Sequence, residues 1–198
     1  HLLPMRSGEA SFPILMAREF GVPFSRSIPG LVFRRVLDLH FVLLLGFMVV
    51  SWGRGPLAWV LVLAMIPAPL LAFKGQKWLF HHLQDRKGRG WEFFRDTLQG
   101  LPATPGAFFR TWIWTAVNWT AKLLVLAWIL RFFAPMPFLW ALLGSTTGEL
   151  SSVLPFHGVA GAGTYEAGVL ASLVPLGLDM ESALGGAINL HLFVLGTS

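Results

Sequence analysis

"PLAWVLVLAMIPAPLLAF", residues 56–73, decides the fold class. This stretch contains no charged side chain, and as a helix it is just long enough to cross the roughly 30 Å hydrocarbon core of a bilayer. Pro67 and Pro69 are expected to kink it, which membrane helices tolerate. Residues 56–73 are therefore predicted to span a membrane.

The composition of the 198-residue chain also favours lipid as its solvent. Apolar residues make up 55% of the chain and charged residues only 13%, whereas a soluble domain has about 25% charged residues. Too little polar surface remains to cover a globule of this size. The absence of cysteine excludes disulfides, zinc-thiolate sites, iron–sulfur clusters and thiol catalysis.

Further apolar segments surround this first span. Residues 37–52 precede it across a short link and should form a helical hairpin with it, and residues 111–130 form a third predicted span. The last apolar segments are short or interrupted by Gly, Pro and hydroxyl residues (137–154, 169–178 and 183–196). We expect an all-α, multi-pass membrane bundle with re-entrant or broken helices. We also expect the chain to be a piece of a longer protein.

Lys and Arg residues are concentrated in two segments, 1–36 and 74–110, while the hairpin turn contains only Arg54. The positive-inside rule places both basic segments in the cytoplasm and predicts a plasma-membrane protein. The basic stretch at 74–96 is interpreted as a cytoplasmic loop with interfacial helices or as an anionic-lipid contact. No nucleic acid partner is expected. The predicted organisation is one membrane domain over 1–198: a first cytoplasmic or re-entrant motif (1–36), a hairpin (37–73), a basic loop (74–110), and spans with a second re-entrant motif (111–198).

A glycine-rich stretch, "LPFHGVAGAGTYEAG" (154–168), raises the question of a nucleotide site. A P-loop requires Lys and Ser or Thr after its last glycine, and here Val169 follows Gly168. A dinucleotide fingerprint would place Gly or Ala where Glu166 stands. In a membrane the glycines suit a broken helix or a small-residue packing face. A packing face does not explain Glu166, because a carboxylate inside a membrane is costly enough to indicate a function by default.

The chain also contains a predicted internal repeat. "LLPMRSGEA" (2–10) and "VLPFHGVAGAGTYEA" (153–167) share Leu-Pro, then Gly, then Glu before Ala. Each is followed by a short apolar run that ends at a glycine, Gly21 or Gly177. Paired broken segments of this kind are typical of inverted transporter repeats. Whether residues 137–154 cross the membrane fully decides whether the two copies enter it from the same face or from opposite faces.

The order of three motifs resembles the transmembrane domain of lysylphosphatidylglycerol synthases and its stand-alone multi-pass relatives. The motifs are "LLPMRSGE" (2–9), "FRRVLDL" (33–39) and the element at 154–166, which has "FHGVAGAG" where a Pro-Gly-Gly run is common in the family. The resemblance implies a flippase for an aminoacylated phosphatidylglycerol or a polyprenyl-linked lipid. No soluble lysyltransferase domain is present, so this chain is not expected to be an enzyme.

The resemblance and the residue chemistry together give a candidate headgroup site. Arg6 and Arg35 would hold a phosphate, and Glu9 and Glu166 would hold amines; the alternative is that Arg35 pairs with Asp38, and Arg6 with Glu9. The predicted headgroup residues are Arg6, Glu9, Arg35, Asp38, Lys122, Glu149, Tyr165 and Glu166. The predicted backbone positions of the re-entrant motifs are Pro4, Gly8, Pro155, Gly158, Gly161 and Gly163.

Lys122 lies in the middle of a predicted span, where a lysine costs about 3 kcal/mol. It should therefore have a carboxylate partner, either Glu149 or Glu166. His40, His157 and His191 are read as polar cavity or packing residues, and no metal or cofactor is expected.

Two other functions remain open. An integral membrane transferase acting on a lipid carrier could use Glu9 or Glu166 as its base, although it would need a metal or a His–carboxylate cluster. The chain could instead anchor a separately encoded synthase without transporting lipid. In every case the expected partner is a membrane phospholipid or a lipid-linked substrate.

Overall fold

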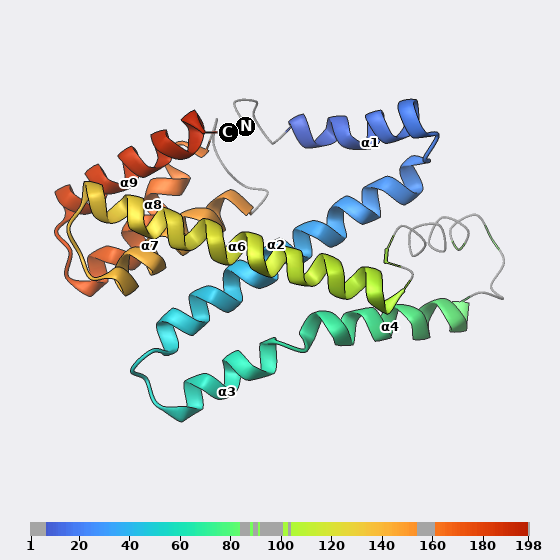
Figure 1. The fold of residues 1–198 in the computed structure, drawn as a ribbon, viewed down its shortest axis with the longest axis horizontal. Coiled ribbons are helices and arrows are strands. Elements are labelled where there is room, and N and C mark those ends of the chain that lie inside the picture. Colours follow the sequence, from blue (N-terminus) through green and yellow to red (C-terminus); the bar gives the residue numbers. More distant parts are fainter. Residues whose placement is uncertain are drawn as a thin grey trace.

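A computed structural model describes residues 7–83, 88, 91, 101–102, 104–153 and 161–197. Within these residues the regular structure is helical throughout (Figure 1), which confirms the predicted all-α class. The elements are α1 (Ser7–Phe20), α2 (Phe24–Ser51), α3 (Pro56–Met65), α4 (Ala68–Leu83), α6 (Pro105–Phe133), α7 (Phe138–Val153), α8 (Thr164–Leu173), the 3-10 helix η3 (Val174–Leu176) and α9 (Met180–Gly196).

Two stretches of the described chain are long and apolar enough to span a membrane, 56–75 and 105–133. The first joins α3 to the start of α4 through a turn at Ile66 and Pro67, where the prolines were expected to kink it. The second is α6, which extends the predicted span 111–130 at both ends. Among the described residues, these are the two predicted spans that are both long enough and apolar enough to cross a membrane.

The other predicted spans differ from the helices that form. Of the predicted span 37–52, residues 37–51 are the later part of α2, a 28-residue helix that begins at Phe24 and includes the charged side chains of Arg34, Arg35 and Asp38. At 1.5 Å per residue, the 16 residues of α7 cover only about 24 Å. The helices α8 and α9 have 10 and 17 residues. Over their described residues, α7, α8 and α9 are therefore each shorter than the roughly 20 residues of a typical membrane-spanning helix.

The helices enclose two apolar cores. In Figure 1, α2 and α6 cross near the middle of the molecule, α3 and α4 run beside them, and α7, α8 and α9 gather around one end of α6. One core lies between α6, α7, α8 and α9 and includes Leu130, Ala141, Val169 and Leu190. The other joins α2, α3, α6 and α7 and includes Phe41, Val62, Trp119 and Val153.

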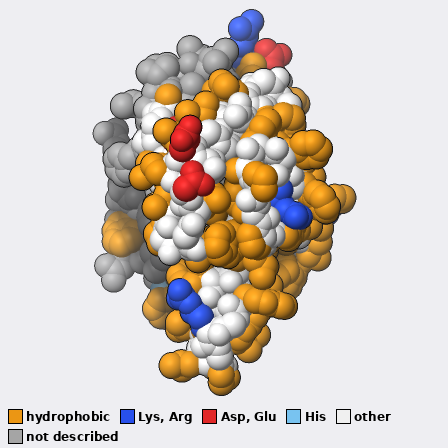
Figure 2. Space-filling view, turned by 90° about the vertical axis from the view of Figure 1, so that its left-hand side faces the viewer, with side chains coloured by type: hydrophobic (Ala, Val, Ile, Leu, Met, Phe, Trp, Pro, Cys, Tyr) orange, Lys and Arg blue, Asp and Glu red, His pale blue; other side chains and the backbone are white. Residues whose placement is uncertain are grey.

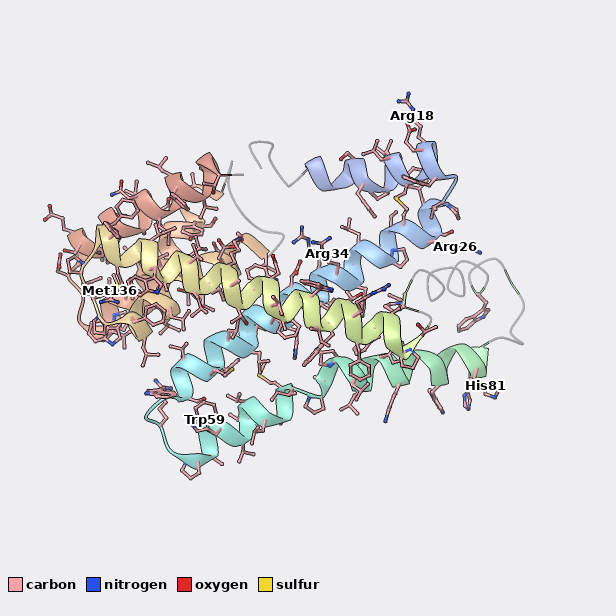
Figure 3. All side chains as sticks on the ribbon, in the orientation of Figure 1. Arg18, Arg26, Arg34, Trp59, His81 and Met136 are labelled. Atoms are coloured by element: carbon pink, nitrogen blue, oxygen red, sulfur yellow. The ribbon has the colours of Figure 1, made fainter. Side chains whose placement is uncertain are left out.

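The described ends of the two basic segments lie at the same end of the molecule. Figure 3 places Arg18, Arg26 and His81 at this end and Trp59 and Met136 toward the other. The hairpin turn at the far end uses Gly53 and Gly55, whose φ angles of +84° and +81° favour glycine. The described parts of segments 1–36 and 74–110 that adjoin α2 and α4 thus lie at one end of the molecule.

The molecular surface is largely apolar. Orange apolar side chains cover much of the face in Figure 2, with isolated charged groups between them. Large side chains such as Leu57 and Phe132 are 78% and 89% exposed. Soluble proteins rarely expose apolar surface so continuously, and lipid tails would cover it.

Candidate functional site

Glu166 is positioned by the first turn of α8. The backbone N–H of Gly163 donates to Glu166 Oε2 at 2.7 Å, so the carboxylate satisfies one of the free donors at the helix N-terminus. Gly163 and Gly161 have φ angles of +83° and +79°, which allow the chain to turn sharply into the helix. The glycines that resembled a nucleotide loop therefore serve to present Glu166.

His191 of α9 is the partner of Glu166. Its Nδ1 lies 2.6 Å from Glu166 Oε1, and the two side chains are 8% and 16% exposed. The His191 ring also stacks on Tyr165, with ring centroids 4.6 Å apart. His191 was predicted to be a polar cavity or packing residue, without this partner, and the signal for the pairing is one imidazole in an otherwise apolar helical stretch.

Lys122 of α6 pairs with Glu149 of α7. Its Nζ lies 2.6 Å from Glu149 Oε2, so Glu149 is the partner among the two carboxylates that were expected. Ser152 Oγ donates to the same oxygen at 3.2 Å. Glu149 is 1% exposed, whereas Lys122 is 39% exposed and reaches the edge of the bundle.

Tyr165 connects these two pairs. Its ring lies over Gly148, where an added β-carbon would stand 2.8 Å from Tyr165 Cζ, and Gly148 precedes Glu149 in α7. Tyr165 is also stacked on His191. Five side chains from four helices thus form one continuous group, the polar cluster: Lys122, Glu149, Tyr165, Glu166 and His191.

The polar cluster contains unused hydrogen-bonding capacity. Among the described residues, Glu149 Oε1, Tyr165 Oη and Ser145 Oγ are buried without a hydrogen-bond partner. Ser145 and Glu149 are one turn apart on α7, hence on the same face. Unpaired buried polar atoms are costly, and native proteins retain them mainly where a function needs them.

Arg35 and Asp38 form a second polar centre, between α2 and α6. Arg35 Nη1 donates to Asp38 Oδ2 at 3.1 Å, which is the helical pairing given as the alternative to phosphate binding. Trp119 Nε1 donates to Asp38 Oδ1 at 2.8 Å. This contact between Trp119 and Asp38 was not predicted from the sequence.

Several predicted site residues cannot be placed. Arg6, Pro4, Pro155 and Gly158 lie outside the described residues. Gly8 and Glu9 belong to the first turn of α1, but the side chain of Glu9 is not described. In the part of the chain that the structure describes, no group of three or more His, Asp or Glu could hold a metal ion.

The chemistry of the polar cluster suits a charged ligand within an apolar environment. It brings together two carboxylates, one ammonium, one imidazole and one phenol, whereas most neighbouring side chains are apolar. Keeping such groups away from water is expensive unless they are paired, and intramembrane ionisable residues usually mark substrate or ion paths.

Comparison with known proteins identifies the family. The family model described as "Lysylphosphatidylglycerol synthase TM region" matches residues 1–197. Neither a curated protein nor a solved structure matches the chain. The family match and the apolar helices together indicate an integral membrane protein with a lipid-related role. The chain belongs to the lysylphosphatidylglycerol synthase TM region family.

Proposed function

We propose that the protein is a flippase-type membrane protein that binds a charged lipid and moves it between the leaflets of the plasma membrane. The lipid would be aminoacyl-phosphatidylglycerol-like or polyprenyl-linked, and segments 1–36 and 74–110 would face the cytoplasm. The observation that carries this proposal is the polar cluster, three of whose side chains lie on α7 and α8, which with 16 and 10 residues are shorter than a membrane-spanning helix.

The two broken helical segments support this proposal by their similar local geometry. Glu9 and Glu166 are each the third residue of their helix, α1 and α8. Both segments end at a glycine with positive φ, Gly21 at +63° and Gly177 at +102°. In each case the next helix begins three residues later. Discontinuous helices in corresponding positions are the usual binding elements of repeat-built transporters.

The headgroup would meet complementary charges at two places. Glu166 is partly exposed and is held in place by Gly163, so an amine of the headgroup could displace His191 as its partner. Arg35 is 32% exposed while contacting Asp38, and the planar guanidinium group is suited to binding a phosphate. These roles match the chemistry of a lipid that carries both a phosphate and an amine.

Leaflet exchange in liposomes tests the function. The full-length protein would be reconstituted with labelled phosphatidylglycerol and, separately, its lysyl form, and the rates compared for wild type, Glu166→Gln and Glu181→Gln. Glu181 is an exposed carboxylate in the first turn of α9 and serves as the matched control. Loss of a charge-assisted hydrogen bond worth about 1.5–3 kcal/mol predicts exchange about 10- to 100-fold slower in Glu166→Gln only. No exchange of either lipid by folded wild-type protein would refute a phosphatidylglycerol-type substrate.

One observation favours a transferase as the second candidate. A histidine oriented by a carboxylate, as His191 is by Glu166, is a common general base. Such an enzyme would form product from a lipid carrier in detergent, where no leaflets exist, and His191→Asn would abolish product formation. Exchange in liposomes without any turnover in detergent would exclude this alternative.

A further inference from the structure

The polar cluster has an unbalanced charge when His191 is neutral. Lys122 contributes one positive charge, and Glu149 and Glu166 contribute one negative charge each. The cluster then has a net charge of −1, and one additional proton on His191 makes it neutral. Because burial disfavours a net charge, one further cation beside Glu166, either a proton on His191 or an amine of a ligand, would balance the cluster.

The other charged groups around the cluster do not supply this missing charge. From α2, which packs on α7, come Arg35 and Asp38, which pair with each other, and His40, whose Nε2 is buried. On α6, Arg131 donates to the Met136 carbonyl. On and before α9, Glu181 and Asp179 are exposed to solvent and add only negative charge. Among the described residues, His191 is thus the group that can neutralise Glu166.

We propose that the Glu166–His191 pair is an exchangeable proton site that couples lipid movement to a transmembrane proton gradient. This inference rests on the proposed flippase function and adds its energy source. In the occupied form, one proton is shared between His191 Nδ1 and Glu166 Oε1, which lie 2.6 Å apart. Release gives a neutral imidazole and a carboxylate, and the proton leaves to water on the opposite side of the membrane.

The unpartnered atoms provide a path to this site. Lys122 is partly exposed at the edge of the bundle, and Glu149 is buried behind it. Glu149 Oε1 and Tyr165 Oη are both buried and unpaired, and the Tyr165 ring leads from Gly148 to the face of His191. A water can bridge polar groups that do not touch directly, and through such a bridge these groups would connect the partly exposed edge of the bundle to the proton site.

Protonation of the Glu166–His191 pair would also change how α8 packs against α9. The Glu166–His191 contact joins α8 to α9, whereas α8 is fixed to α7 by glycine contacts at Gly148 and Gly168. Deprotonation removes the ion pair and leaves a net negative cluster between α6 and α9. That state favours an amine-bearing headgroup as the replacement cation, which links proton release to lipid binding.

The test imposes a pH gradient on proteoliposomes that contain the full-length protein, with the membrane potential clamped and labelled lysyl-phosphatidylglycerol, whose headgroup carries the required amine, as the probe. With one proton moved per lipid, a gradient of one pH unit shifts the leaflet ratio by up to about tenfold. We expect this shift in wild type and in the control variants His81→Asn and Glu181→Gln, and its loss in His191→Asn and Glu166→Gln. Lipid exchange in wild type with a leaflet ratio that does not respond to the pH gradient would overturn the proton inference and leave the flippase function intact.

A second measurement keeps the two proposals separate. If wild type exchanges no lipid, the flippase function fails, and infrared titration of the purified full-length protein between pH 5 and 9 still decides the proton site. We expect wild type and His81→Asn to take up about one proton more than His191→Asn over this range. Equal uptake by wild type and His191→Asn would overturn the site.

Discussion

Gly168 of α8 lies against the carbonyl group of Thr147 in α7, so closely that a β-carbon at position 168 would stand 2.6 Å from that oxygen. One turn further along α8, Ser172 Oγ is 2.9 Å from Thr147 Oγ1. Close backbone contact and hydroxyl pairing are the main means by which helices associate in lipid, where apolar surface gives no driving force. This contact fixes α8 on α7 and so holds Tyr165 beside Glu149.

Gly168→Ala should destabilise the protein by about 2 kcal/mol, as overpacking of a tight interface does. The obstacle is a backbone carbonyl, which cannot move unless α7 shifts with it. The nine tryptophans allow thermal unfolding in detergent to be followed by intrinsic fluorescence. Gly185→Ala is the control, because no atom lies within 4 Å of a β-carbon there and alanine is the better helix former. Equal losses in both variants would refute the role of this contact.

Lys122→Met should also destabilise the protein, because it leaves the Glu149 carboxylate buried without a cation. Breaking a fully buried ion pair costs about 3–5 kcal/mol. Since Lys122 is 39% exposed, we expect about 2 kcal/mol here. The double variant Lys122→Met with Glu149→Gln removes both charges and should recover part of this loss. Strictly additive losses in chemical unfolding would show that the two residues do not interact.

Composition and the uncharged run at 56–73 were sufficient to predict a helical membrane protein, because a bilayer permits few other structures. The pairing of Lys122 with a carboxylate was also predictable, because an unpaired lysine in the middle of a span is costly. The choice of Glu149 over Glu166 was not, because it depends on how α6 and α7 align along the core that they share. That alignment is set by packing between side chains far apart in the sequence.

The start of α2 and the Glu166–His191 pair were both missed. The predicted span began at residue 37, but the helix begins at Phe24 and continues through Arg34 and Arg35. Asp38 within it is satisfied by Arg35 and Trp119. His191 is 25 residues from Glu166 and on a different helix. Their meeting depends on the turn at Gly177, whose φ of +102° directs α9 back along α8.

Trp119→Phe should weaken the contact between α2 and α6, because Asp38 Oδ1 loses its indole donor. A hydrogen bond to a charged group contributes about 1.5–3 kcal/mol, and Arg35 still contacts the other carboxylate oxygen, so we expect a loss near the lower value. Trp114→Phe is the matched control, since Trp114 is 67% exposed. Unfolding midpoints in detergent would compare the variants, and similar midpoints for both would contradict the prediction.

Asp179 gives a prediction about acid stability. It caps α9 by accepting the backbone N–H of Ser182 at 2.8 Å, and this hydrogen bond holds the pKa of Asp179 below its usual 3.8. A lowered folded-state pKa means that the stabilisation is present above pH 3.8 and is lost as the pH falls through the folded pKa. The melting temperatures of wild type and Asp179→Ala should therefore differ at neutral pH and converge below pH 3.8. A difference that does not change with pH would show that the charge is irrelevant.

The inverted repeat predicts which side of the membrane each turn faces. In Figure 1 the turn between α1 and α2 lies at the same end as the end of α4, while the turn between η3 and α9 lies at the opposite end with the α2–α3 turn. Single cysteines can be introduced at exposed Glu19, His82, Arg54 and Glu181, because the chain has no other cysteine. A membrane-impermeant thiol reagent added to intact cells should label Arg54→Cys and Glu181→Cys but reach Glu19→Cys and His82→Cys only after the membrane is opened. Labelling of Glu19→Cys and Glu181→Cys from the same side would exclude the inverted repeat, and the pair at Arg54 and His82 independently reports the orientation of the hairpin.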